Sequence, residues 1–225
     1  MARILNLETA TTNCSVSLAK DGKVVAIREH NTPNYSHAEQ LHVFIQELVD
    51  EASLSLDAID AVAVSKGPGS YTGLRIGVSA AKGLCFALDK PLISVDTLQS
   101  LAVHRETDGF DVVIPVLDAR RMEVYSAVFD GHARALRETE AEIVTANSFV
   151  EYTKKGQVLL IGNGAGKCQD IIKHPKVSFA PQAFPSAHEM TGLSYEKFQK
   201  HDFEDVAYFE PFYLKDFILQ SKKKA

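Results

Sequence analysis

The sequence contains no tryptophan, only three cysteines and no long hydrophobic run. Cys14, Cys85 and Cys168 are odd in number and far apart, which fits neither a disulfide framework nor a CxxC metal site. No apolar stretch approaches the ~20 residues that span a bilayer. Near the start of the sequence, Arg3 is followed by a short apolar stretch that Glu8 ends, and this segment lacks the long apolar core of a signal peptide. We therefore expect a cytoplasmic protein with reduced thiols and no membrane contact.

Positive charge is also scarce. Lysine and arginine total 24 against 29 aspartates and glutamates, a net charge of -5. Such a surface does not attract a polyanion such as tRNA as a whole, so contact with nucleic acid needs a local patch or a partner. The composition, 45% hydrophobic and 24% charged, excludes disordered, collagen-like and coiled-coil classes. At roughly 150 residues per domain, the 225 residues predict one large domain or two lobes.

The first half of the chain predicts an antiparallel opening followed by two α/β units. Asp21-Gly22 is a two-residue hairpin signal, and the Ser36-x-x-Glu39 capping box starts a helix. Strands are expected at Arg3–Leu7, Ser15–Ala19, Val24–Glu29, Ala61–Val64 and Leu92–Val95. Helices are expected from His37 to about Glu51, from Gly73 to Leu88, and from Thr97 to about Val103.

The charged stretch His104–Asp111 is the best candidate for a boundary. It predicts a first lobe over residues 1–103 and a second over residues 104–225. The second half has strand patterns at Val112–Leu117, Val124–Phe129 and Val158–Ile161, and a capping box at Ser186 for a late helix. No internal sequence repeat is visible.

The loop Gly67–Gly73 lies between a predicted strand and a predicted helix, a position where free backbone N–H groups can bind an anion. Its candidate nucleotide-binding residues are Gly67, Gly69, Ser70, Thr72 and Gly73. The spacing matches neither GxGxxG nor GxxxxGK[ST]. The alternative is a tight turn in which glycines only permit positive φ.

Two further motifs each admit a structural interpretation. Gly162–Lys167 follows a predicted strand but fails both the P-loop and the Rossmann patterns, which favours a plain glycine turn over the alternative of a weak nucleotide contact. Asp118 ends a predicted strand, so its carboxylate can serve as a base or magnesium ligand, or can hold a turn through an Asp–Arg pair. No Ser/His/Asp or Cys/His arrangement can be assembled.

The two helices of the first half suggest an interaction surface. His37 and His42 are five residues apart and do not share a helix face, which argues against a metal site. His37 falls on the apolar stripe, where packing or an interface hydrogen bond is the simpler role. The small residues of Gly73–Leu88 indicate a close helix contact, which periodicity leaves open as internal or with another subunit.

The longest motif, Gly67-Pro-Gly-Ser-Tyr-Thr-Gly-Leu-Arg-Ile-Gly77, together with Ser36-His-Ala-Glu-Gln-Leu41, resembles the TsaB (YeaZ) family. The resemblance is dense over residues 1–103 and patchy afterwards. It continues at Val78–Leu88, at Asp118-Ala-Arg, at Glu123-Val-Tyr125 and at Pro211-Phe-Tyr-Leu214.

The resemblance implies a two-lobed ASKHA (actin, sugar kinase and Hsp70-like) fold of mixed sheets flanked by helices. It also implies a role in forming N6-threonylcarbamoyladenosine next to the tRNA anticodon. In that family TsaB is a noncatalytic partner of the related subunit TsaD, which holds the metal and transfers the threonylcarbamoyl group, and TsaE is an accessory ATPase. This sequence departs from its relatives at His42, where the second histidine of the TsaD pair is displaced, and at Glu8, where the family has aspartate.

The leading hypothesis is therefore a noncatalytic scaffold that binds and activates TsaD together with TsaE, with no catalytic residue and no metal. We expect no intrinsic cofactor, with ATP or ADP entering at the interface of the complex. We expect a homodimer when TsaD is absent, tRNA contact only indirectly or through the complex, and a solvated end at Lys222–Lys224. The alternative is an active ASKHA-type ATPase or small kinase that uses the Gly67–Gly73 loop. The expected partner interface comprises His37, Leu41, Gly73, Gly77, Ala80 and Ala81.

Overall fold

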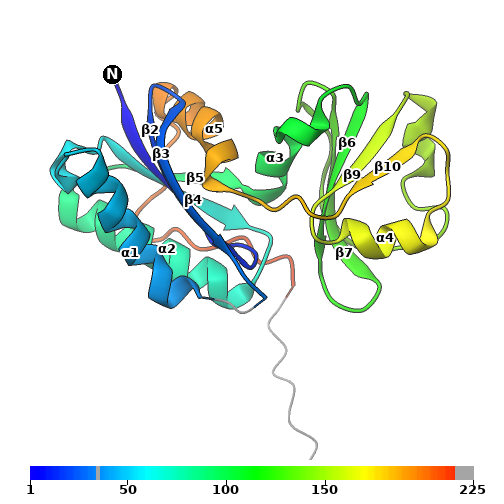
Figure 1. Cartoon of the computed structure of the whole chain (residues 1–225), viewed down its shortest axis with the longest axis horizontal. Helices are drawn as coiled ribbons and strands as arrows, with labels where there is room; N and C mark the ends of the chain where they lie inside the picture. The colour runs from blue at the N-terminus through cyan, green and yellow to red at the C-terminus, as the bar shows by residue number, and fades with distance from the viewer. Residues whose placement is uncertain (34–35, 216–225) are drawn as a thin grey trace, which may run out of the picture.

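The computed structural model describes residues 1–33 and 36–215, which form two lobes side by side (Figure 1). Each lobe is built on a five-stranded mixed sheet with helices on its faces. The prediction for Lys222–Lys224 lies outside the described residues.

The first sheet has the strand order β3-β2-β1-β4-β5. Its first three strands pair antiparallel, joined between β2 and β3 by the expected turn at Asp21-Gly22, and its last two add in parallel. The strands are β1 (Arg3–Glu8), β2 (Asn13–Lys20), β3 (Lys23–Asn31), β4 (Ala61–Gly67) and β5 (Leu92–Asp96). The helices of this half are α1 (His37–Glu51), α2 (Tyr71–Leu88) and α3 (Thr97–Ala102), with short 3₁₀ turns η1 (Leu56–Ala58) and η2 (Arg105–Thr107).

The second sheet has the order β10-β9-β6-β7-β8, the same pattern as the first. Again three antiparallel strands are followed by two parallel ones. The strands are β6 (Val112–Asp118), β7 (Glu123–Asp130), β8 (Ala135–Ile143), β9 (Val158–Ile161) and β10 (Val177–Ala180). The remaining elements are η3 (Val150–Lys154), α4 (Ala165–Ile171) and α5 (Ala187–Gln199).

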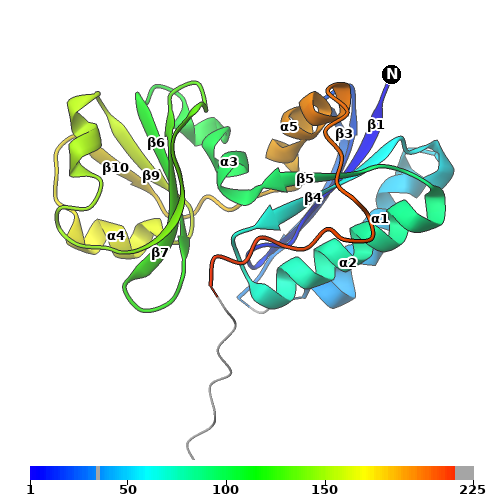
Figure 2. The same cartoon turned by 180° about the vertical axis from the view of Figure 1, so that it is seen from behind.

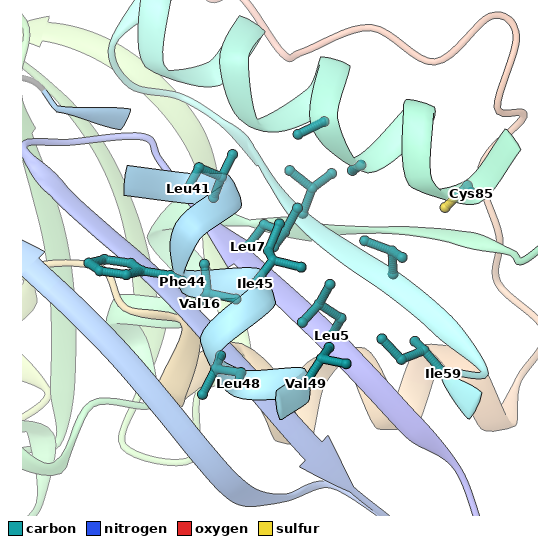
Figure 3. Close-up of a cluster of buried hydrophobic side chains, with 14 of the residues drawn as sticks. Leu5, Leu7, Val16, Leu41, Phe44, Ile45, Leu48, Val49, Ile59 and Cys85 are labelled. Carbon is teal, nitrogen blue, oxygen red and sulfur yellow. The ribbon is translucent and has the colours of Figure 1, made fainter. Parts of the chain in front are cut away.

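Side chains alternate between the two faces of each sheet, so each sheet has two apolar layers. On the outer face of the first sheet, Leu41 and Ile45 of α1 pack with Leu5 and Leu7 of β1 and with Cys85 of α2 (Figure 3). Helix α5 packs on the inner face of the same sheet through Met190. This double cover explains why β1 and β4 consist almost entirely of buried residues.

The helices on either side of the expected division at residue 103 cross over between the two sheets. Helix α3 comes before that residue, but its Leu98 and Leu101 pack on the second sheet. Helix α5 comes after it, but packs on the first sheet. The two helices contact each other between the sheets (Figure 1), because each sheet needs a cover on its inner face. The lobes are therefore interleaved in sequence.

The predicted helices and strands of the first half are all present, with ends that differ by a few residues. In the second half β8, β10 and α4 were not predicted. Strand β8 is highly charged, with the sequence ALRETEAEI, because it is an edge strand of the sheet. Such a strand lacks the apolar alternation on which its prediction depends.

Candidate functional site

Helices α1 and α2 lie side by side on the outer face of the first sheet (Figure 1). Their side chains form a groove of about 740 Å³ between the two helices. The groove is lined from α1 by Ala38 and His42, and from α2 by Tyr71, Thr72, Arg75, Ile76, Ser79, Ala80, Gly83 and Leu84. A second groove of about 600 Å³ lies between α2 and the chain that follows α5. Its lining residues are Lys82, Gly83, Phe86, Asp205, Val206 and Ala207. Because Gly83 lines both grooves, they form one continuous surface, which we call the helix face.

The start of α2 is fixed by its cap. The Ser70 hydroxyl accepts a hydrogen bond from the Gly73 amide at 3.3 Å, which satisfies one of the free N–H groups of the first turn. Asp89 ends the helix in the left-handed conformation. The Ser36 side chain, in contrast, makes no capping bond at the start of α1, so the expected capping box is not formed there.

The small residues of α2 make an internal contact. A Cβ atom on Gly73 would lie 2.1 Å from the Thr9 carbonyl oxygen, and one on Gly77 would lie 2.2 Å from the Thr9 hydroxyl. Ala81 is fully buried in the same layer. Glycine is required at both positions, because any side chain would push α2 away from the turn between β1 and β2.

The predicted interface residues of α1 also point into the protein. Leu41 is fully buried, and His37 is only 1% exposed. The His37 Nε2 donates to the Thr11 carbonyl at 2.7 Å, and burial lowers the pKa of the imidazole, so the ring is a neutral donor in the core. The structure therefore shows His37 packed in the core, with a hydrogen bond inside its own lobe.

The structure thus brings the predicted interface residues together, but with their side chains inward. Ala80 lines the groove, whereas the other five pack against the lobe itself. The opposite side of α2 carries a second stripe, which lines the two grooves through Thr72, Arg75, Ser79, Gly83 and Phe86. A signal for it was present in the sequence, because Phe86 is apolar and lies off the small-residue face. Phe86 is 85% exposed, and Val43 on α1 is 48% exposed.

The Gly67–Gly73 loop packs tightly on the β1–β2 turn. A Cβ atom on Gly69 would lie 2.4 Å from the Ala10 carbonyl oxygen, and the Ser70 amide donates to that oxygen at 2.7 Å. Gly67 has φ of 111°, and its amide donates to the Thr97 hydroxyl. These glycines therefore permit close backbone contact, as the tight-turn alternative requires. Nucleotide binding by this loop stays a prediction.

Glu8 lies at the start of the β1–β2 turn and is fully buried. Its Oε1 accepts a hydrogen bond from the Ala10 amide at 2.6 Å, while Oε2 has no partner. Desolvation raises the pKa of this carboxyl from 4.5 to about 7. The carboxyl is thus directed toward its own turn.

Asp118 holds the turn between β6 and β7. Its Oδ1 accepts from the Lys167 Nζ at 2.8 Å and from the Arg120 amide at 2.6 Å. The same ammonium donates to the carbonyls of Arg121 and Glu123, at 3.1 and 2.5 Å. The structural interpretation of Asp118 is therefore supported, but with lysine in place of the expected arginine. Gly162, at φ 116°, starts the glycine turn that delivers Lys167 to this position.

The described residues also bear on metal binding and on membrane insertion. In residues 1–33 and 36–215, no three His, Cys, Asp or Glu side chains are grouped in a way that could hold a metal ion. No helix within this part of the chain is long and apolar enough to cross a membrane.

Known proteins resemble the chain along most of its length. The sequence pattern of the family described as tRNA N6-adenosine threonylcarbamoyltransferase (TsaD) matches residues 32–222. The Escherichia coli K12 protein named tRNA threonylcarbamoyladenosine biosynthesis protein TsaB is 30% identical over 227 residues, which cover 98% of this chain and 97% of that protein. The Bacillus subtilis protein of the same name is 34% identical over 128 residues, 56% of this chain and 54% of that protein.

Solved structures agree with this match. YeaZ from Pseudomonas aeruginosa superposes with a TM-score of 0.83 at 28% identity, over 95% of this chain and 100% of that chain. The ROK hexokinase from Thermus thermophilus gives a TM-score of 0.50 at 13% identity, over 88% of this chain and 99% of that chain, a likeness of fold alone. The expected ASKHA fold is confirmed.

Proposed function

Because the chain belongs to the TsaB family, whose role is in the biosynthesis of tRNA threonylcarbamoyladenosine, we propose that it is a noncatalytic subunit that binds and activates the transferase TsaD together with TsaE. In this proposal the complex forms N6-threonylcarbamoyladenosine next to the anticodon in the cytoplasm. The chain has no intrinsic cofactor, and ATP or ADP enters at the interface of the complex.

The helix face is the observation that carries the proposal. It combines two adjoining grooves with Phe86, an aromatic side chain that is 85% exposed. A soluble protein rarely leaves a large ring so exposed beside a concave surface unless the ring anchors a partner. The polar groups of the β1–β2 and β6–β7 turns offer less support for catalysis, because Glu8 and Asp118 are engaged in bonds within the chain.

The same face predicts the behaviour of the chain without its partner. A groove flanked by an exposed ring can pair with a second copy about a twofold axis. We therefore propose that the homodimer and the complex with TsaD use the helix face in turn. Light scattering that shows only monomer at tens of micromolar would argue against this competition.

Partner binding can be tested with a matched pair of variants. Phe86→Ala removes the exposed ring of the helix face, whereas Ile143→Ala removes a side chain that is 69% exposed on β8 of the other lobe. We expect Phe86→Ala to weaken binding to TsaD about tenfold or more, as measured by titration calorimetry, and Ile143→Ala to leave it unchanged. If both variants bind TsaD with equal affinity, the interface with TsaD does not include Phe86 of the helix face.

Activation is tested by reconstitution. Threonylcarbamoyl transfer to tRNA is followed with threonylcarbamoyl-AMP, TsaD and TsaE, with this chain present, omitted or supplied alone. We expect product only when both this chain and TsaD are present. Product from this chain alone, or ATP turnover that Asp118→Asn abolishes, would instead support the ATPase or small-kinase alternative.

A further inference from the structure

The chain that follows α5 connects the two lobes. We call residues 203–215 the C-terminal strap, which runs from α5 along α2 toward the second lobe (Figure 2). The Lys82 Nζ donates to the carbonyls of Ala207 and Phe209 at 3.1 and 2.9 Å, and the Phe212 amide donates to the Lys66 carbonyl at 2.7 Å. At its end, Lys215 forms an ion pair with Glu123 of β7. The strap therefore places its last residues next to both lobes.

Aromatic rings gather where the strap passes the start of α2. The ring centroids of Tyr213 and Tyr71 lie 5.1 Å apart, and the Arg75 guanidinium carbon lies 5.3 Å from the Tyr71 centroid. Arg75 also donates to the Tyr71 hydroxyl at 2.9 Å, which fixes this stack. Tyr213 and Phe212 remain 38% and 42% exposed. Fixed, partly exposed rings are the platforms on which unpaired bases stack.

Unpaired positive charge lies at the other end of the same region. Arg120 and Arg121 form the tip of the β6–β7 turn, are both exposed, and both adopt positive φ, 70° and 49°. Lys167 holds the turn from inside by bonding Asp118 and two backbone carbonyls.

The nearby carboxylates do not neutralise these arginines. Asp118 is paired with Lys167, and Glu123 is paired with Lys215. Among residues 1–33 and 36–215, the guanidinium groups of Arg120, Arg121 and Arg75 have no carboxylate partner. Burial is the main cause that raises the pKa of the Tyr213 hydroxyl, and the negative charge of Glu210 on the strap adds to that rise. The net charge of the residues around this end of the strap is therefore positive, although the whole chain carries a net charge of -5.

We infer that this region is a direct contact site for single-stranded RNA, an inference that rests on the proposed role in tRNA modification. Tyr213 and Phe212 supply stacking for unpaired bases, and Arg120 and Arg121 supply charge for the flanking phosphates. A duplex presents its bases within grooves that such a surface cannot enter, so the site favours a loop over a stem. Because the site contacts few phosphates, its affinity for RNA is low and depends on salt. Within the complex the affinity is higher, because the other subunits hold the RNA close to the site.

The test uses the full chain, alone and with TsaD, and a fluorescent RNA hairpin whose loop has the size of an anticodon loop. Fluorescence anisotropy is measured at several KCl concentrations, with a fully paired RNA of the same length for comparison. The first variant is Arg120→Gly with Arg121→Gly, in which glycine adopts the positive φ without strain. Its matched control is Lys154→Gln with Lys155→Gln, which removes two exposed charges elsewhere in the second lobe.

We expect the double arginine variant to bind the hairpin about tenfold more weakly at low salt. Its salt dependence should also fall, by about 0.7 in logarithmic slope for each lost phosphate contact. Tyr213→Ala should weaken binding about fivefold or more with an unchanged slope, and Tyr213→Phe should restore it. The lysine control should bind as the wild type does.

The inference is overturned if the wild type binds neither RNA, alone or with TsaD, or if the arginine variant and the lysine control bind equally. The RNA site and the proposed function can be refuted independently of each other. Wild-type protein that activates TsaD normally without binding the hairpin refutes the RNA site alone. Hairpin binding that depends on Arg120 and Tyr213, in a protein that does not activate TsaD, refutes the proposed function alone.

Discussion

The two lobes share one strand order, and their equivalent turns have opposite chemistry. In chain order, the first strand of each sheet ends in a carboxylate, Glu8 in β1 and Asp118 in β6. The fourth strand of each sheet, β4 or β9, ends at or next to a glycine of positive φ, Gly67 or Gly162. In the first lobe the carboxyl is fully buried, and its pKa is raised to about 7. In the second lobe the Asp118 side chain is 49% exposed and pairs with Lys167.

The difference follows from what covers each turn. In the first lobe the long helix α2 lies directly against the β1–β2 turn, because Gly73 and Gly77 allow it to approach Thr9. In the second lobe the corresponding helix α4 spans only Ala165–Ile171, and its Lys167 reaches the turn with a flexible, charged side chain. One topology thus supports a closed, buried turn or an open, ionic one, depending on the helix that follows the glycine.

The largest effect is expected where α2 touches the turn. Gly77→Ala places a Cβ atom 2.2 Å from the Thr9 hydroxyl, so α2 or the turn must move. We expect a loss of about 3 kcal/mol in the free energy of unfolding, measured by urea denaturation. A bulkier change such as Gly77→Leu would test folding rather than partner binding. Wild-type stability of Gly77→Ala would mean that the close approach is not required.

A comparable effect is expected from the pH dependence of the first lobe. Because burial raises the Glu8 pKa from 4.5 to about 7, the folded state favours the neutral carboxyl. The protonated Glu8 carboxyl contributes fully to the free energy of unfolding below pH 4.5. This contribution is lost as the pH rises through 7, which lowers the free energy of unfolding by about 3 kcal/mol. Glu189, whose pKa burial also raises, acts in the same direction.

Glu8→Gln should therefore flatten the stability profile between these pH values, with the larger gain in stability at the alkaline end. Urea denaturation at a series of pH values measures the profile. A profile with the wild-type slope would show that Glu8 is ionised in the folded protein and that the contrast between the two turns is smaller than the structure implies.

A smaller and local effect is expected in the second lobe. Lys167→Met removes the ammonium that joins Asp118 to the carbonyls of Arg121 and Glu123. We expect the free energy of unfolding to fall by about 1.5 kcal/mol, and trypsin to cleave faster after Arg120 and Arg121. The control is Lys173→Met, whose exposed Nζ bonds only the Gln169 carbonyl. Similar cleavage rates for both variants would contradict the role of Lys167.

The smallest effect is expected on the outward side of α2. A Cβ atom on Gly83 meets nothing within 4 Å. Gly83→Ala should raise the free energy of unfolding by about 0.5–1 kcal/mol, because alanine is the better helix former. Gly77→Ala and Gly83→Ala are thus expected to change the free energy of unfolding in opposite directions. The comparison distinguishes the internal side of α2 from the side that belongs to the helix face. A destabilising Gly83→Ala would mean that the two sides are less distinct.

Most of the first half could be predicted because its signals are local. The hairpin turn at Asp21-Gly22, the apolar stripe of α1 and the strand–loop–helix pattern at Gly67 each depend on residues close in sequence. Strand β8 could not be predicted, because an edge strand needs little apolar alternation. The repeat of topology was also invisible, because equivalent turns carry different residues, Glu8 with Gly67 in one lobe and Asp118 with Lys167 in the other.

Most helices and strands, and the family to which the chain belongs, could be predicted from the sequence, since periodicity and motifs are local properties. The side of α2 that faces outward, in contrast, depends on packing between elements far apart in the chain. Small residues permit close contact with any neighbour, and it was the position of Thr9 that made Gly73 and Gly77 internal and left Phe86 exposed. Likewise, the exchange of α3 and α5 between the lobes and the meeting of Tyr213 with Tyr71 depend on contacts between residues far apart in the chain.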